Sequence, residues 1–207
     1  LYHTLFRLIE GKKNYKWFGC VKNYSSLSPN DIQKLSIALK EKNMYLIEID
    51  SDTFNKNFIF FKEILEPLFH YYSLNNAIIE EFLKFDMYWE AYKKMNEKLC
   101  EAIMPYLNDN SLIYLDDYHF FLVPSILYSR YSKLKKNLQD ISIGLFMHSP
   151  FPSHEIFKRI PFREEILKSM ISCSVIGFHT FDYSRNFLKS AKRLLNINYE
   201  TTMNGEL

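Results

Sequence analysis

The sequence predicts an α/β fold in which a parallel sheet is flanked by helices. Three short apolar runs, at 112–115, 141–147 and 175–178, each precede a segment with helical periodicity. They recur about every thirty residues, a spacing typical of strand–helix–strand units with parallel strands. The runs are almost continuously apolar, as expected of strands that helices cover on both faces.

The N-terminal half continues this alternation. Residues 15–21 (YKWFGCV) and 44–49 are predicted strands. Between them, Ser28-Pro29-Asn30-Asp31 indicates a helix start, with a capping serine, proline at the first helical position and an acid in the first turn.

Longer helices are predicted on both sides of the first apolar run. Apolar residues at helical spacing predict helices over 54–69, 89–106, 120–131, 161–172 and 183–195. The second of these places Trp89, Tyr92, Leu99 and Ile103 roughly on one face.

Composition excludes several functional classes. Of 207 residues, 47% are hydrophobic and 24% charged, which is enough for the core of one large domain or one lobe. The net charge of +2 argues against a nucleic-acid partner. No apolar stretch approaches the ~20 residues of a membrane span. Cys20, Cys100 and Cys173 form no CxxC pair, which favours a reduced, cytoplasmic protein.

Polar residues follow all three apolar runs. Asp116 and Asp117 come after the first, His148 after the second and His179 after the third. Because the carboxyl ends of parallel strands share one edge, where open α/β sheets bind ligands, we expect these side chains to meet in a crevice. The alternative is that each is only a helix cap or turn former.

Sequence motifs exclude the common cofactor and metal sites. The sequence contains no GxxxxGK[ST], GxGxxG, GxSxG or HExxH pattern. His154-Glu155 lacks a third ligand at a recognisable spacing, so we expect neither zinc nor another cofactor.

Three long motifs resemble the trehalose-6-phosphate synthases, retaining glycosyltransferases that join glucose from UDP-glucose to glucose 6-phosphate. The motifs are DDYHFFLVPSIL, IGLFMHSPFPSHEIFKRIPFREEIL and SVIGFHTFDYSRNFL. Upstream, WFG, PLFHYY and AYKKMNEKLCEAI match in the same order. The resemblance implies a GT-B fold of two Rossmann-like lobes, with residues 1–207 as the single N-terminal, acceptor-side lobe. The C-terminal lobe of the same parent would be its partner and would hold most of the UDP-glucose site. This family type requires no metal.

The resemblance also assigns roles to individual residues. Asp117 matches the family's acceptor-site aspartate, His148 a histidine beside the donor glucose, and Trp17 a tryptophan lining the glucose 6-phosphate pocket. His119 and His179 match positions of structural role. Asp116 stands where many synthases have histidine.

Two positions depart from the family pattern. Glu66 replaces an acceptor-site tryptophan, and Asn57 aligns with a tyrosine, with Phe58 next to it. The carboxylate of Glu66 is expected to repel the phosphate of the acceptor. Because the donor-binding lobe is not in this chain, the resemblance predicts a synthase lobe that is inactive on its own. The alternative is a catalytically silent synthase-like module that binds sugar phosphates or regulates, which Glu66 and Asn57 favour.

Overall fold

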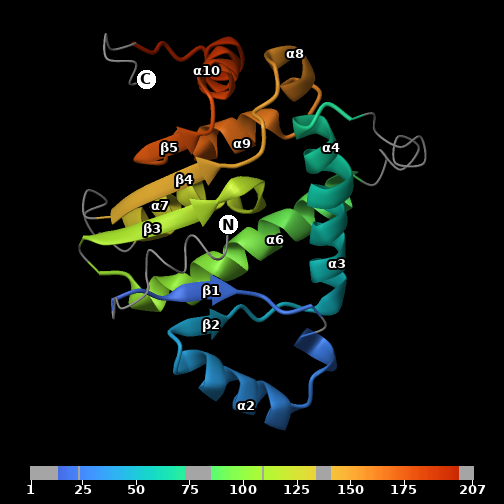
Figure 1. The fold of residues 1–207 in the computed structure, drawn as a ribbon, viewed down its shortest axis with the longest axis vertical. Helices are drawn as coiled ribbons and strands as arrows, with labels where there is room; N and C mark the ends of the chain where they lie inside the picture. Colours follow the sequence, from blue (N-terminus) through green and yellow to red (C-terminus); the bar gives the residue numbers. More distant parts are fainter. Residues whose placement is uncertain (1–13, 23, 73–84, 109, 134–140, 201–207) are drawn as a thin grey trace. The chain divides into compact units, whose positions relative to one another are not determined.

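The computed structural model describes residues 14–22, 24–72, 85–108, 110–133 and 141–200 (Figure 1). The chain divides into two compact units, Leu1–Asp52 and Thr53–Leu207. Among the helices in these ranges, none combines the length and the hydrophobicity that a membrane-spanning segment requires.

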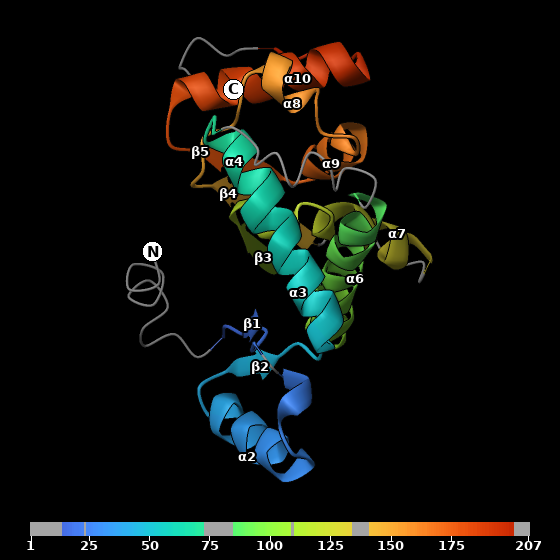
Figure 2. The same ribbon diagram turned by 90° about the vertical axis from the view of Figure 1, so that its right-hand side faces the viewer.

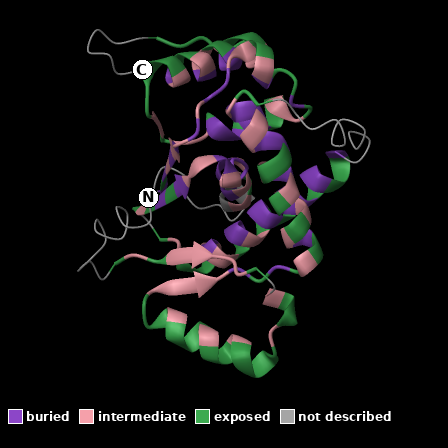
Figure 3. Cartoon of the chain, turned by 45° about the vertical axis from the view of Figure 1, so that its right-hand side comes forward, coloured by how far each residue is buried: buried purple, intermediate pink, exposed green. Residues whose placement is uncertain are grey.

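The first unit contains one parallel strand pair. Strand β1 (Trp17–Gly19) pairs with β2 (Met44–Leu46), and α2 (Pro29–Lys40) connects them. The Ser28 side chain accepts from the Asp31 amide at 3.2 Å and Pro29 opens the helix, which confirms the predicted start. Helix α2 buries no residue (Figure 3). Both strands are shorter than predicted, at three residues each.

The second unit contains a three-stranded parallel sheet. Strands β3 (Ser111–Asp116), β4 (Ile141–Met147) and β5 (Val175–Phe178) lie side by side in that order (Figure 1). The register pairs Asp116 with Phe146 and Met147 with Phe178, so the three carboxyl ends lie close together along one edge. The predicted parallel sheet is confirmed.

Helices pack against this sheet and against one another. Helix α7 (Val123–Lys133) packs against α6 (Phe85–Ile103) and α9 (Arg163–Met170), whereas α10 (Phe181–Leu195) packs against β5, α9 and the short α8 (His154–Phe157). The predicted cover on a second face is not seen for β3 among the described residues of this unit: Ile113 and Leu115 are buried, whereas Leu112 and Tyr114 are 76% and 49% exposed. Strand β3 thus alternates between a core side and an exposed side.

A continuous helical run precedes the sheet. It consists of α3 (Ser51–Ile59), a π-helical stretch Phe60–Leu65 and α4 (Glu66–Phe69), and Figure 2 shows it as one rod. The sequence predicted a helix over 54–69 but not its π-helical part, because periodicity alone does not reveal a local change of hydrogen-bond register. Phe60 and Phe69 are fully buried, so the run is anchored on the core.

Candidate functional site

The turn after β3 has an unusual backbone conformation. Asp117 begins a 3₁₀ turn, Asp117–Phe120, and has a φ of 55°, in the left-handed region that non-glycine residues rarely adopt. Such strain persists where surrounding contacts enforce it, and it concentrates at functional sites.

Side chains of helix α6 form hydrogen bonds with the backbone of this turn. The buried Tyr92 hydroxyl donates to the Tyr118 carbonyl at 2.7 Å and accepts from the Phe121 amide at 2.9 Å. One turn along, Asn96 donates to the His119 carbonyl at 3.4 Å and accepts from the Leu122 amide at 3.1 Å. Tyr92 and Asn96 of α6 therefore provide hydrogen-bond partners for backbone N–H and C=O groups of the turn that are not paired in the sheet.

The Asp117 carboxylate joins the ends of β3 and β4. Its Oδ2 accepts from the Ser149 amide at 3.2 Å and from the Ser149 hydroxyl at 3.0 Å, and its Oδ1 accepts from the Tyr118 amide at 3.0 Å. Burial raises the pKa of Asp117, while the bonds from Ser149 and the nearby His119 act in the opposite direction. The strained turn is thereby tied to the loop that carries His148.

The other three strand-end side chains also meet. His148 Nε2 lies 3.0 Å from Asp116 Oδ1, and His148 Nδ1 lies 3.1 Å from His179 Nε2. This confirms the expected convergence of three strand ends. Asp116 occupies the N-cap position of the 3₁₀ turn without a capping hydrogen bond from its side chain, and Thr180, not His179, is the N-cap residue of α10.

Glu66 faces the same turn from α4. It accepts from Lys62 Nζ with both oxygens, at 2.9 and 2.8 Å, and from the Tyr118 hydroxyl. Burial first, and then the Glu66 carboxylate, raise the pKa of Tyr118. Burial lowers the pKa of His119, partly opposed by Asp117 and other carboxylates. The glutamate is thus paired with a cation that the sequence interpretation did not include.

Asn57 and Phe58 face different surroundings. Asn57 is buried at 6% exposure and its Oδ1 has no hydrogen-bond partner within the described part of the chain, whereas Phe58 is 46% exposed. The Phe58 ring packs edge-on against Phe61 at 5.1 Å, and Phe61 packs edge-on against His119 at 4.6 Å. An aromatic chain therefore leads from Phe58 to the turn, while Asn57 points into the core.

Trp17 belongs to the first unit and the other four predicted site residues to the second. Trp17 is half-buried, and its amide donates to the Asn43 carbonyl at 2.8 Å. Of the predicted residues, the second unit brings Asp117, His148 and Glu66 to one edge of the sheet and leaves Asn57 in the core.

Comparison with known proteins places this geometry in a family. The model of glycosyltransferase family 20 matches residues 2–206. The chain belongs to glycosyltransferase family 20. This result confirms the resemblance on which the sequence interpretation rested.

Individual relatives and solved structures are also similar to this chain. The UDP-forming α,α-trehalose-phosphate synthase of Pichia angusta is 38% identical over 93% of this chain, and the chain spans 39% of that relative's length. The N-terminal domain of the trehalose-6-phosphate phosphatase of Candida albicans superposes with a TM-score of 0.74 at 23% identity, over 91% of this chain and 38% of that one. A UDP-forming synthase of Burkholderia xenovorans, solved with glucose 6-phosphate, gives 0.53 at 22% identity, over 72% and 29%. The GT-B fold is confirmed, and the chain covers a part of it.

Sequence reasoning about this family 20 chain missed three supporting residues. Apolar periodicity predicts only a packing role for Tyr92 and indicates no role for Asn96, one helical turn later on that face. A buried asparagine on an apolar stripe was the available signal, since buried amides are normally hydrogen-bonded. The third missed residue is Lys62, which lies four residues before Glu66, a spacing at which oppositely charged side chains on a helix pair.

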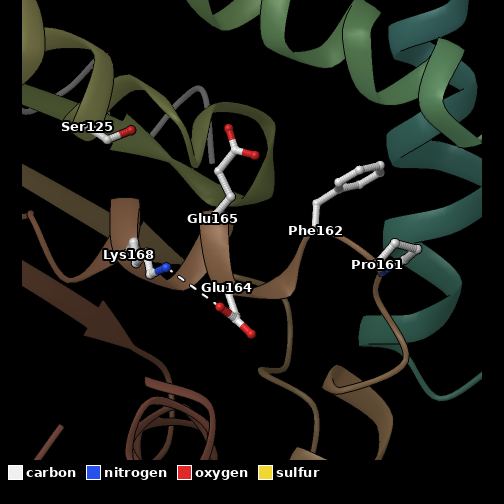
Figure 4. A pocket seen from close by; sticks show the side chains of 6 residues that line it. All are labelled: Ser125, Pro161, Phe162, Glu164, Glu165 and Lys168. Atoms are coloured by element: carbon white, nitrogen blue, oxygen red, sulfur yellow. Dashed lines mark ion pairs between the residues drawn. The ribbon is translucent and has the colours of Figure 1, made fainter. Parts of the chain in front are cut away.

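A pocket lies apart from these residues. It has a volume of about 420 Å³, and its lining comprises Ser125, Pro161, Phe162, Glu164, Glu165 and Lys168 (Figure 4). Lys168 forms an ion pair with Glu164 at 3.6 Å. None of the predicted site residues lines it. Among the residues that the structure describes, no group of three or more His, Cys, Asp or Glu side chains could hold a metal ion.

Proposed function

We propose that this chain is the N-terminal, acceptor-side lobe of a trehalose-6-phosphate synthase that transfers glucose from UDP-glucose to glucose 6-phosphate. The name of the Pichia angusta relative supports the product and the UDP leaving group. The Burkholderia xenovorans structure supports the acceptor, because it contains glucose 6-phosphate. The C-terminal lobe of the parent supplies most of the donor site, and we propose a cytoplasmic location for the activity.

The observation that carries the proposal is the convergence of Asp117 and His148 at one edge of the sheet. The Asp117 carboxylate accepts two bonds from Ser149, the residue directly after His148. Retaining transfer without a covalent intermediate depends on holding the acceptor hydroxyl against the anomeric carbon. Asp117, which would bind the acceptor hydroxyls, is connected through Ser149 to His148, which would contact the donor sugar. This arrangement suits that task.

His148 contributes by position and electrostatics. It stands beside the donor glucose on a loop that Pro150 and Pro152 stiffen. A preorganised polar group aimed at a reacting centre stabilises developing charge without reorganising during the reaction. Asp117, with its carboxylate largely desolvated, orients the acceptor from the neighbouring strand end.

The acceptor pocket of this chain differs from the family pattern without losing the means to bind a phosphate. Glu66 stays a proposed acceptor-site residue, and Lys62 balances its charge. Phe58 joins Asn57 as a candidate for the aromatic position, because it is exposed whereas Asn57 is buried. Trp17 remains a proposed pocket residue on the strength of the family resemblance.

The alternative of a catalytically silent module rested on Glu66 and Asn57. A lysine pairs with the first, and an exposed phenylalanine stands beside the second. Both observations are compatible with an active enzyme whose acceptor pocket is modified, so they give the silent module no advantage.

The decisive experiment uses the full-length parent protein. Incubated with UDP-glucose and glucose 6-phosphate, it should release UDP and form trehalose 6-phosphate, detected by coupled assay and mass spectrometry. Asp117→Asn should abolish most of this activity, while Asp182→Asn, on the exposed side of α10, should not. Binding of both substrates without any product would refute the synthase and support the silent module.

A further inference from the structure

Both ring nitrogens of His148 are already engaged within this chain. Nε2 lies 3.0 Å from the Asp116 carboxylate at the end of β3, and Nδ1 lies 3.1 Å from His179 Nε2 just after β5. Each contact therefore joins the end of β4 to a different neighbouring strand. The side chains of His148 and Asp116 are 25% and 34% exposed, so the pair lies at the surface of the sheet edge.

The chemistry of these groups determines where the protons lie. An ionised carboxylate only accepts hydrogen bonds, so Nε2 of His148 must carry a proton. In neutral His148, Nδ1 is then the acceptor, and His179 Nε2 must donate to it. When His148 is protonated, the His179 bond reverses but the bond to Asp116 remains. Asp116 thus keeps the same hydrogen bond in both protonation states.

Packing beneath the two imidazoles fixes their positions. The Phe146 ring lies 4.7 Å from the His148 ring and 5.1 Å from the His179 ring. Gly177 on β5 makes room for this ring, because a Cβ at that position would lie 2.5 Å from a carbon of Phe146. Gly177, Phe146 and Asp116, from three adjacent strands, therefore fix the orientation of the His148 imidazole.

We propose that Asp116 is a positioning residue for His148, fixing the Nε2–H form and the orientation of the ring in which His148 meets the donor sugar. This proposal rests on the proposed function. Exposed ion pairs contribute little to stability, and the strand ends are already held by the sheet ladder. The Asp116–His148 bond therefore acts on the placement of the ring more than on the stability of the fold.

The proposal predicts a specific kinetic pattern in the full-length protein. Asp116→Ala removes the acceptor and should lower kcat by roughly ten- to a hundredfold, since small misplacements of reacting groups have effects of that order. The KM for glucose 6-phosphate should stay unchanged. Asp116→Asn retains an acceptor oxygen and should recover part of the loss. Asp182→Ala, which removes an exposed aspartate paired with Arg185 inside α10, is the matched control and should leave kcat unchanged.

A second readout is independent of turnover. Proton NMR of full-length protein with labelled histidine should show a downfield His148 Nε2–H resonance that disappears in both Asp116→Ala and His148→Gln. Its absence from the natural protein, or an Asp116→Ala variant that changes acceptor KM and not kcat, would overturn the proposal. A natural protein that shows the resonance but transfers no glucose would refute the proposed function and leave Asp116 as the residue that positions His148.

Discussion

The ion pair between Lys62 and Glu66 leads to a prediction about the proposed acceptor, glucose 6-phosphate. A carboxylate ~6 Å from one phosphate charge repels it by roughly 2–3 kcal/mol at an effective dielectric near 20. Lys62 Nζ lies 2.9 and 2.8 Å from the two Glu66 oxygens, so its attraction for the same phosphate is of similar size. The two side chains are 47% and 27% exposed, and solvent screening lowers each effect to about 1–1.5 kcal/mol.

Single substitutions should therefore have opposite effects on the binding of glucose 6-phosphate to the full-length protein. Lys62→Ala leaves the carboxylate unbalanced and should weaken binding about tenfold, because ~1.4 kcal/mol is a factor of ten. Glu66→Gln leaves the lysine alone and should strengthen binding by a similar factor. The double variant should bind nearly as the natural protein does.

Calorimetric titration with glucose 6-phosphate and with glucose measures this cycle. Glucose lacks the phosphate, so its affinity should respond little to either change. Lys98→Ala is the matched control, because Lys98 pairs with Glu101 at 3.0 Å on α6 and is 42% exposed. The charge-balance reasoning fails if Lys62→Ala leaves glucose 6-phosphate affinity unchanged, or weakens glucose binding equally.

Three further predictions concern the turn and its neighbours. Tyr92→Phe leaves the buried Phe121 amide without its acceptor and should lower the free energy of unfolding by about 1–3 kcal/mol in urea titrations; a loss under ~0.5 kcal/mol would contradict the anchoring role. Burial lowers the pKa of His119 from its ordinary 6.5, so the unfolded chain binds more protons and stability falls as pH drops below 6.5. His119→Gln should flatten that part of the stability curve, and an unaltered slope would argue against a buried neutral imidazole. His148→Ala should lower turnover on the order of a hundredfold and spare acceptor binding; unchanged turnover would remove His148 from the site.

The strand ends were predictable because they depend on short-range patterns. Apolar runs gave β4 and β5 their bounds, and parallel pairing brings their carboxyl ends to one edge. The contact between Asp116, His148 and His179 follows from that topology. The hydrogen bonds of Tyr92 and Asn96 to the turn after β3 could not be derived, because they join residues more than twenty positions apart through side-chain geometry.

The phase of the helical run explains why the acceptor residues were harder to assign. Family matching placed the missing tyrosine at Asn57, nine residues before Glu66. In an uninterrupted α-helix, nine residues bring two side chains about half a turn out of phase, because each residue turns by about 100°. Burial agrees with that phase difference: Asn57 lies in the core at 6% exposure, whereas the Glu66 side chain is 27% exposed and Phe58 is 46% exposed. Phe58, Lys62 and Glu66 follow one another at intervals of four residues and are all at least partly exposed, so Phe58 rather than Asn57 shares the accessible side of the run with Lys62 and Glu66.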